Sequence, residues 1–573
     1  MKPQILALLA ALTLASGAQA ATHDLIIRNA MIYDGSGSPP FAGEIAIDGD
    51  RITALAPHVS GKARKVIDAG GKAVSPGFIN MLSWATESLI ADGRGLSELK
   101  QGITLQVMGE GTSMGPISPE MKARETRRMG DIKYDITWSS LDDYLTTLTA
   151  RGIAQNVASF VGAATVREYV LGEGDVDPTP EQLAQMRKLV VTAMEGGALG
   201  VGSSLIYAPA NYAETPELIA LATDAGRCGG IYISHMRSEG DRLLEAIDEL
   251  IEISARSGAP AEIYHLKAGG RPNWPKMDLA IARIEAARAQ GHRITADMYT
   301  YTAGSTGLDA AMPPWVQAGG VEAWIARLRD PATRAKVIGE MRETRPRFEN
   351  LYIHAGAEGT LLVGFKNPAM KGLTGKTLAE VAMARGVSPE DAAIDLVIED
   401  GSRVQVVYFL MSEDNVRKQT ALPWMSFASD ASAQAPEGVF LQSSTHPRAY
   451  GNFARLLGKY VREEKTTTLT DAVHRLTSMP ARNLGLHDRG ELKVGYFADL
   501  VIFDPATIAD HAEYAAPRQF STGVSEVIVN GKLVLAGGEP TGAAAGQVVR
   551  GRGWTGWSDG GCRNSAKAWS WAW

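Results

Sequence analysis

The stretch from Gly229 to Gly270 reads GGIYISHMRSEGDRLLEAIDELIEISARSGAPAEIYHLKAGG. GGIYIS is typical of a short buried strand, DRLLEAIDELIEISARSG has apolar residues at helical spacing, and PAEIY is strand-like again. His235 follows the first strand and His265 follows the second. Because the parallel strands of a βαβ unit end at the same edge of a sheet, both imidazoles should meet where α/β barrels place their chemistry. Two imidazoles at one edge favour a transition-metal site, and the alternative is a separate polar cap on each strand.

Eight strand-like runs alternate with helical ones along the middle of the chain. They are PGFIN (76–80), GITLQVMG (102–109), NVASFVGAAT (156–165), GALGVGSSLIY (197–207), GGIYIS (229–234), PAEIYHLK (260–267), HRITADMY (292–299) and PWMSFASDA (423–431). Eight strands with intervening helices are typical of a TIM-like (β/α)8 barrel, so the predicted fold class is α/β. The last run ends in Asp430, which should face the same edge of the barrel as the two histidines.

The segment between Thr306 and Pro423 is far longer than an ordinary loop between a strand and a helix. It holds helical runs such as DPATRAKVIGEMRE and SPEDAAIDLVIEDG. We therefore expect an inserted helical subdomain at about 307–422 that covers the barrel mouth.

Two blocks rich in β-branched residues and Gly/Asp turns flank the barrel. Residues 21–75 form the first block and residues 486–550 the second, in which Asn530-Gly531 is a hairpin signal. We expect one small β-sandwich built from both chain ends, around a barrel at 76–485. The tail at 551–573 is aromatic and Gly/Ser-rich without a period, and we expect it to pack weakly or to be disordered.

The composition describes an ordinary globular protein. The chain has 573 residues, 45% hydrophobic and 21% charged, and its formal charge of -7 gives no sign of nucleic-acid binding. Residues 1–20 carry Lys2, an apolar run and the small-residue site Ala18-Gln19-Ala20, which is typical of a secretory signal peptide. We expect a periplasmic or secreted protein with no membrane attachment after signal removal. The spacing of Cys228 and Cys562 leaves a disulfide between them undecided.

Several motifs together resemble one known family. They are HMRSEGD (235–241), HLKAGG (265–270), DMYTYTAGST (297–306), SDA (429–431), THPRAYGNFARLLGKYVRE (445–463) and FADLVIFDP (497–505). With them, nearly the whole mature chain resembles the N-acyl-D-amino-acid deacylases, or D-aminoacylases, of the amidohydrolase superfamily. The resemblance implies a zinc-dependent barrel hydrolase that cleaves an amide with a metal-bound hydroxide. Its expected partner is a small molecule, an N-acyl amino acid.

The resemblance also implies roles for single residues. His235 and His265 match the metal ligands of the family, and Asp430 matches its catalytic base. The residues that match the holders of the substrate carboxylate are Lys267, Tyr299, Ser305 and Arg448. His446, two residues before Arg448, is expected either to contact the substrate region or to be structural.

Two departures from the family pattern concern the metal. Members usually carry His-x-His after the first strand, whereas this chain has Leu82 and Trp84, so we expect one zinc ion and an apolar acyl pocket. Members also carry a metal-binding Cys in the turn after the second strand, where this chain reads Gly109-Glu110-Gly111-Thr112. A carboxylate with two histidines is a standard set for a hydrolytic zinc, so Glu110 is the third candidate ligand. The alternative is a surface glutamate in a glycine-rich turn.

The predicted function is hydrolysis of the amide bond of N-acyl amino acids, with D-amino acids favoured by the resemblance. One alternative is the same fold with another reaction, such as that of a deaminase or of a cyclic-amide, carbamate or lactone hydrolase; Arg448 and Lys267 argue against it because they suit a free carboxylate. The other alternative is a secreted binding protein that has lost catalysis. The presence of both histidines together with Asp430 argues against that reading.

Overall fold

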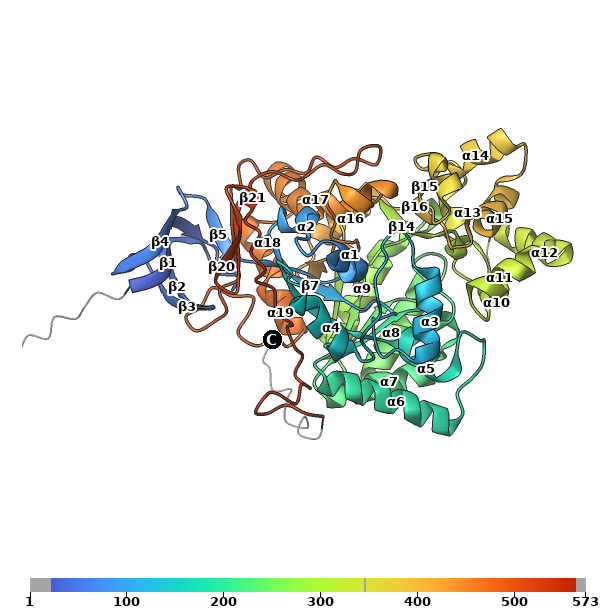
Figure 1. The fold of residues 1–573 in the computed structure, drawn as a ribbon, viewed down its shortest axis with the longest axis horizontal. Coiled ribbons are helices and arrows are strands. Elements are labelled where there is room, and N and C mark those ends of the chain that lie inside the picture. The colour runs from blue at the N-terminus through green and yellow to red at the C-terminus, as the bar shows by residue number, and fades with distance from the viewer. Residues whose placement is uncertain (1–21, 345–346, 563–573) are drawn as a thin grey trace, which may run out of the picture.

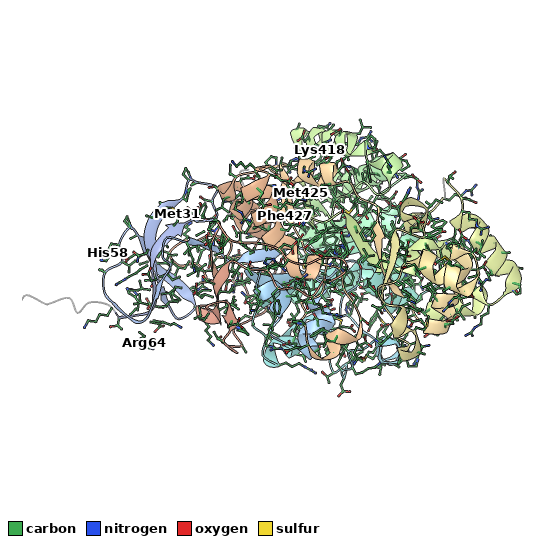
Figure 2. All side chains as sticks on the ribbon, turned by 90° about the horizontal axis from the view of Figure 1, so that it is seen from above. Met31, His58, Arg64, Lys418, Met425 and Phe427 are labelled. Atoms are coloured by element: carbon green, nitrogen blue, oxygen red, sulfur yellow. A yellow bond between two sulfur atoms is a disulfide. The ribbon has the colours of Figure 1, made fainter. Side chains whose placement is uncertain are left out.

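The computed structural model describes residues 22–344 and 347–562, so the expected signal peptide lies outside the described residues. The molecule is elongated, with a unit of β-strands at one end, a barrel in the middle and a mainly helical unit at the other end (Figure 1). In the view from above, Met31, His58 and Arg64 are labelled at the β-strand end, and Met425 and Phe427 of the last barrel strand, which are both fully buried, are labelled nearer the middle (Figure 2).

One nine-stranded sheet takes strands from both ends of the chain. Its order is β21-β20-β19-β18-β5-β1-β2-β3, with β4 paired to β1. The strands are β1 (Thr22–Ile32), β2 (Phe41–Asp48), β3 (Arg51–Ala56), β4 (Lys62–Asp68), β5 (Ala73–Pro76), β18 (Leu500–Phe503), β19 (Val524–Val529), β20 (Lys532–Ala536) and β21 (Glu539–Pro540). Asn530 and Gly531 both have positive φ in the β19–β20 turn, as a tight hairpin requires. The expected composite of both chain ends is confirmed.

The barrel consists of two parallel sheets that close on each other. One has the order β6-β7-β8 and the other β17-β13-β12-β11-β10-β9. The strands are β6 (Phe78–Asn80), β7 (Ile103–Met108), β8 (Asn156–Ser159), β9 (Val161–Gly162), β10 (Gly200–Ser204), β11 (Ile231–His235), β12 (Ala261–Ile263), β13 (Ile294–Met298) and β17 (Met425–Phe427). Only Phe160 separates β8 from β9, so these two count as one barrel strand. The Met81 amide donates to the Phe427 carbonyl at 3.3 Å, which joins the first barrel strand to the last. The predicted eight-stranded barrel is therefore present.

Helices cover the outside of the barrel strands. Between successive strands lie α7 (Thr215–Arg227), α8 (Leu243–Ser257) and α9 (Lys276–Ala289). In α8 the buried residues Leu243, Ile247, Leu250 and Ile253 recur at helical spacing, as the apolar pattern of this stretch predicts. This βαβ unit brings His235 and His265 to the same edge of the sheet.

The insertion is mixed rather than helical, which corrects the prediction. It contains an antiparallel sheet of order β14-β16-β15 besides its helices. The elements are β14 (Ala303–Gly307), α10 (Pro314–Gln317), α11 (Val321–Leu328), α12 (Pro331–Met341), α13 (Leu351–Ala355), β15 (Thr360–Gly364), α14 (Leu378–Arg385), α15 (Pro389–Asp400) and β16 (Gln405–Phe409). The sheet begins at Ala303, before the expected boundary. Helix α16 (Glu413–Thr420) contacts the barrel, where Nε2 of the Gln419 side chain donates to the Leu266 carbonyl at 2.6 Å.

The tail is ordered over residues 551–562, so the expectation of weak packing is wrong for this part. Cys562 forms a disulfide with Cys228, in the short turn between α7 and β11, and the Gly551 amide donates to the Gly197 carbonyl at 2.9 Å. Both contacts lie at the amino ends of barrel strands, on the side away from the histidines. Residues 563–573 lie outside the described residues. None of the helices in the described ranges has the length and apolar character of a membrane span.

Candidate metal centre and active site

Glu110, His235 and His265 converge at the carboxyl ends of β7, β11 and β12. Oε1 of Glu110 lies 3.0 Å from Nδ1 of His235 and 3.0 Å from Nε2 of His265. All three side chains are buried, and one ligand atom from each lies within 4.8 Å of the others. Two imidazole nitrogens and one carboxylate oxygen are the donors that a hydrolytic zinc uses, with a coordination position left for water. The sequence predicted this set.

The turn that carries Glu110 explains why this carboxylate points inward. Gly109 and Gly111 both have positive φ, a backbone conformation that residues with a side chain rarely adopt. A Cβ atom at Gly111 would lie 1.9 Å from Oγ of Ser204, and one at Gly109 would lie 2.4 Å from the Phe160 carbonyl oxygen. The turn therefore packs closely against β8 and β10, and Glu110 is only 4% exposed. The reading of Glu110 as a surface residue is wrong.

Two site residues have an unusual backbone conformation. His265 has φ of 35° and Asp430 has φ of 48°, both in the left-handed region that non-glycine residues rarely occupy. The amide of His265 donates to Oδ1 of Asp297 at 2.8 Å, which supports its conformation. Strained residues of this kind concentrate at functional sites, where the surrounding structure holds them.

Glu239 belongs to the site although the sequence alone assigned it no role. It lies in the loop after β11, and its Oε1 is 2.9 Å from Nδ1 of His265 and accepts a hydrogen bond from Nζ of Lys267 at 2.6 Å. Its Oε2 lies 3.4 Å from Nε2 of His235. Glu239 thus faces the second nitrogen of both histidines, as carboxylates that orient metal ligands do. The signal was its place in HMRSEGD, four residues after His235.

The charges around the histidines favour a cation. Burial raises the pKa of Glu110, but His265 and His235 outweigh burial and hold this pKa well below its usual range. Burial and Lys267 lower the pKa of His265, but Glu239 and Glu110 outweigh them and raise it to about 10. Two ionised carboxylates therefore enclose the imidazoles and attract positive charge. The positive charge of a divalent ion held by Glu110, His235 and His265 would balance these carboxylates, so the residues fit the metal.

Asp430 lies beside the three ligands and has two close partners. Nε1 of Trp84 donates a hydrogen bond to its Oδ1 at 3.0 Å. Nη1 of Arg448 lies 2.8 Å from its Oδ2 in an ion pair. Burial raises the pKa of Asp430 above its ordinary value, against the opposing effects of Arg448 and His265. A buried carboxylate with a raised pKa is a suitable general base.

Next to Asp430 the site has a cationic end. Arg448 is buried, and among the described residues neither its Nε nor its Nη1 makes a hydrogen bond of good geometry. Its guanidinium lies 4.4 Å from the ring centre of Tyr299, whose hydroxyl is also buried without a partner in the described ranges. Nζ of Lys267 lies 5.6 Å from the same ring. The structure thus brings together three of the four residues predicted to hold a carboxylate.

Ser305 and His446 line the same cavity, but their polar atoms form hydrogen bonds with other groups of the protein. Oγ of Ser305, on β14, donates to the Val406 carbonyl at 2.9 Å. Nδ1 of His446 accepts from the Arg448 amide at 3.0 Å, and its Nε2 lies 2.9 Å from the Ala303 carbonyl oxygen. Burial and Arg448 hold the pKa of His446 well below its usual range. His446 therefore holds the Arg448 segment from the cavity wall, which supports a structural role, and its contact with the substrate stays a prediction.

The cavity above these residues has a volume of about 600 Å³, within the usual range for a small-molecule site. The barrel supplies the metal ligands and Asp430, and the insertion supplies Trp324, Val363 and Arg403. Trp84 lines the cavity, whereas Leu82 is fully buried in the barrel core. The predicted acyl pocket is therefore wrong for Leu82, because its side chain points to the apolar barrel interior.

A barrel with two histidines, a glutamate and an aspartate at the carboxyl ends of its strands defines a metal-dependent hydrolase. Comparison with known proteins identifies the group to which it belongs. Residues 65–535 match the amidohydrolase family, so the chain belongs to that family. It is 31% identical to the D-aminoacylase of Alcaligenes xylosoxydans xylosoxydans over 530 residues, which covers 92% of this chain and 97% of the relative.

Solved structures give the same result. The N-acyl-D-glutamate deacylase from Bordetella bronchiseptica, complexed with zinc and a phosphonate mimic of the tetrahedral intermediate, superposes with a TM-score of 0.76 at 29% identity. The match covers 92% of this chain and 100% of that one. A D-aminoacylase described as having a binuclear metal centre, with one-metal activation and second-metal attenuation, superposes equally well, with a TM-score of 0.76 at 29% identity over 92% of this chain and 100% of that one.

Proposed function

We propose that this chain is a secreted, zinc-dependent deacylase that cleaves the amide bond of N-acyl-D-amino acids. One observation carries the proposal: the buried guanidinium of Arg448, whose Nε and Nη1 make no hydrogen bond of good geometry in the described ranges, lies next to the general base and the metal ligands. A guanidinium binds a carboxylate through two parallel hydrogen bonds, in bidentate geometry. In an N-acyl amino acid, a single carbon separates the carboxylate from the amide nitrogen. Arg448 therefore suits a substrate whose scissile bond lies at Asp430.

The chain's own residues account for the proton transfers. When bound to Glu110, His235 and His265, zinc supplies a Lewis acid that polarises the scissile carbonyl and acidifies water. Asp430 takes one proton from the attacking water and passes it to the amide nitrogen as the C–N bond breaks. The second proton of the water passes from the new carboxyl group to the released amine, so the products are a carboxylate and an amino acid with an ammonium group, and atoms and charges balance. Arg448, Lys267 and Tyr299 hold the substrate carboxylate and thereby fix the amide at Asp430.

Binding of substrate requires a rearrangement of ion pairs. Nζ of Lys267 contacts Glu239, and Nη1 of Arg448 contacts Asp430. A substrate carboxylate competes for both cations, and its arrival separates Arg448 from the base. That separation weakens the stabilisation of the Asp430 anion by Arg448 and so favours proton transfer to Asp430. The carboxylate clamp, made of Arg448, Lys267 and Tyr299, is therefore coupled to the base through the ion pair between Arg448 and Asp430.

Export is part of the proposal. The signal-like residues 1–20 support it, and so does the pairing of the two cysteines of the chain, because structural disulfides persist mainly in oxidising compartments. The D configuration of the amino acid is supported by the D-aminoacylase and the N-acyl-D-glutamate deacylase with which the chain aligns.

A panel of N-acetyl amino acids tests the proposal. Purified protein loaded with zinc is assayed for release of a free α-amino group from N-acetyl-D-amino acids, from N-acetyl-L-amino acids and from the carboxamides of the same N-acetyl-D-amino acids. We expect hydrolysis of the D-acids and little of the L-acids or the carboxamides. Preference for substrates without a free carboxylate would contradict the role of Arg448 and favour another reaction of the fold.

A further inference from the structure

Backbone hydrogen bonds fix Trp84 beside Asp430. The Asp430 amide donates to the Leu82 carbonyl at 2.9 Å, and the Trp84 amide donates to the Ala431 carbonyl at 3.0 Å. Ser83 and Ala431 also form a parallel bridge. These contacts join the first and last strands of the barrel at the site itself and hold the backbone of Trp84 next to that of Asp430.

The indole orients the carboxylate. Within the described ranges, the contact from Nε1 of Trp84 to Oδ1 at 3.0 Å is the one side-chain hydrogen bond that Asp430 accepts. Arg448 approaches the other oxygen at 2.8 Å, but as an ion pair without good hydrogen-bond geometry. An indole N–H donates and never accepts, so Trp84 holds Asp430 without coordinating a metal.

The same residue opposes a second metal ion. In the family pattern, a second ion next to the one held by Glu110, His235 and His265 has its ligands in the His-x-His at the end of the first strand. Leu82 is fully buried among apolar residues there, and Trp84 offers a proton with partial positive charge. Among the residues that the structure describes, the group able to hold a metal consists of those three ligands alone.

We infer that Trp84 is a positioning residue that takes the place of a second metal: its indole N–H holds Asp430 as the base for one zinc ion and keeps a second ion out. The inference rests on the proposed zinc-dependent deacylation. It implies that excess zinc does not attenuate this enzyme, whereas the D-aminoacylase with the binuclear centre is described as showing second-metal attenuation.

Trp84→Phe tests the hydrogen bond, because it keeps an aromatic ring and removes the N–H. Trp84 is 37% exposed, so the fold should tolerate the change. We expect one zinc per chain, a KM close to that of the wild type and a kcat lower by roughly ten- to a hundredfold, the usual worth of a hydrogen bond to a charged group. Trp315→Phe is the matched control, because Nε1 of Trp315 donates to Oε2 of Glu340 at the same 3.0 Å within the insertion. Its kcat should not change.

Trp84→His tests the exclusion of the second ion, because an imidazole offers a ligand next to the carboxylates of Asp430 and Glu110. We expect its zinc content to rise above one per chain, while the wild type stays at one under excess zinc and keeps its activity. A wild type with two tightly bound ions, a Trp84→Phe variant with wild-type kcat, or a Trp84→His variant that stays at one zinc would overturn the inference. Zinc content is measured without substrate, so a chain that binds one zinc but cleaves no N-acyl amino acid would refute the proposed function alone.

Discussion

Replacing Glu239 by glutamine should weaken zinc binding without removing a zinc ligand. Glutamine keeps the size of the side chain but loses its charge. In the wild type this carboxylate lies 2.9 Å from Nδ1 of His265 and 3.4 Å from Nε2 of His235, the ring nitrogens that point away from Glu110. A proton on each of these nitrogens leaves the other nitrogen free to bind the metal, and the negative charge of Glu239 stabilises that arrangement.

The magnitude follows from the number of contacts. Loss of one carboxylate behind a metal-bound histidine typically costs about 10- to 100-fold in metal affinity. Because Glu239 serves both histidines, we expect a loss near the upper end, about 100-fold or ~2.7 kcal/mol. Glutamine also leaves the Lys267 ammonium, 2.7 Å from Nδ1 of His265, without its carboxylate partner. Its unbalanced positive charge then repels the metal.

Competition with a chelator measures this loss directly as a zinc dissociation constant. Glu349→Gln is the matched control: this buried glutamate accepts from Oγ of Ser238 at 2.6 Å and from the Glu239 amide at 3.0 Å, so it supports the same loop without facing either histidine. We expect weak zinc binding only in Glu239→Gln, with activity recovered at high zinc. Equal zinc affinity in the wild type and Glu239→Gln, or an equal loss in both variants, would refute the reasoning.

Three further predictions concern the base, the clamp and the disulfide. Asp430→Asn should keep its zinc while kcat falls by ~10² to 10⁴. In the wild type, activity should fall with decreasing pH as the raised pKa of Asp430 is crossed, and this acid limb should be missing from the pH–rate profile of the variant. Loss of zinc from the variant would instead make Asp430 a ligand. Arg448→Lys should raise KM for N-acyl amino acids but not for their carboxamides, because lysine lacks the planar fork, and equal losses on both would indicate a structural role. Cys228→Ser should lower the melting temperature through the loss of roughly 2–5 kcal/mol, because the disulfide spans 334 residues; an unchanged melting curve would show that the tail contributes no stability.

The sequence predicted the barrel because its strand and helix periods are regular. GGIYIS and PAEIY are each followed closely by a histidine, and this repeated pattern is enough to place His235 and His265 at one edge of the sheet. The resemblance then added Asp430 and the cationic residues. The resemblance also pointed to the Gly109–Thr112 turn, where the family carries a cysteine, and the chemistry of metal donors then selected the carboxylate of Glu110 in it.

Other features depend on three-dimensional contacts that local patterns do not encode. The strands of the insertion are short and were hidden among strong helical runs, so its sheet was missed. Glu239 is one of 64 acidic residues, and its place in HMRSEGD did not by itself reveal that it approaches both histidines. The bond from Trp84 to Asp430 joins residues 346 positions apart. The pairing of Cys228 with Cys562 likewise requires that the tail return to the barrel.

Zinc titration of metal-free protein, followed by turnover of an N-acetyl-D-amino acid, tests the central claim most directly. The account predicts that activity rises in proportion to added zinc, reaches its plateau at one equivalent per chain and stays there under excess zinc. His265→Ala, which lacks one of the three ligands, should show no such stoichiometric rise. Full activity without zinc, or a plateau only at two equivalents, would contradict a deacylase built on a single zinc at Glu110, His235 and His265.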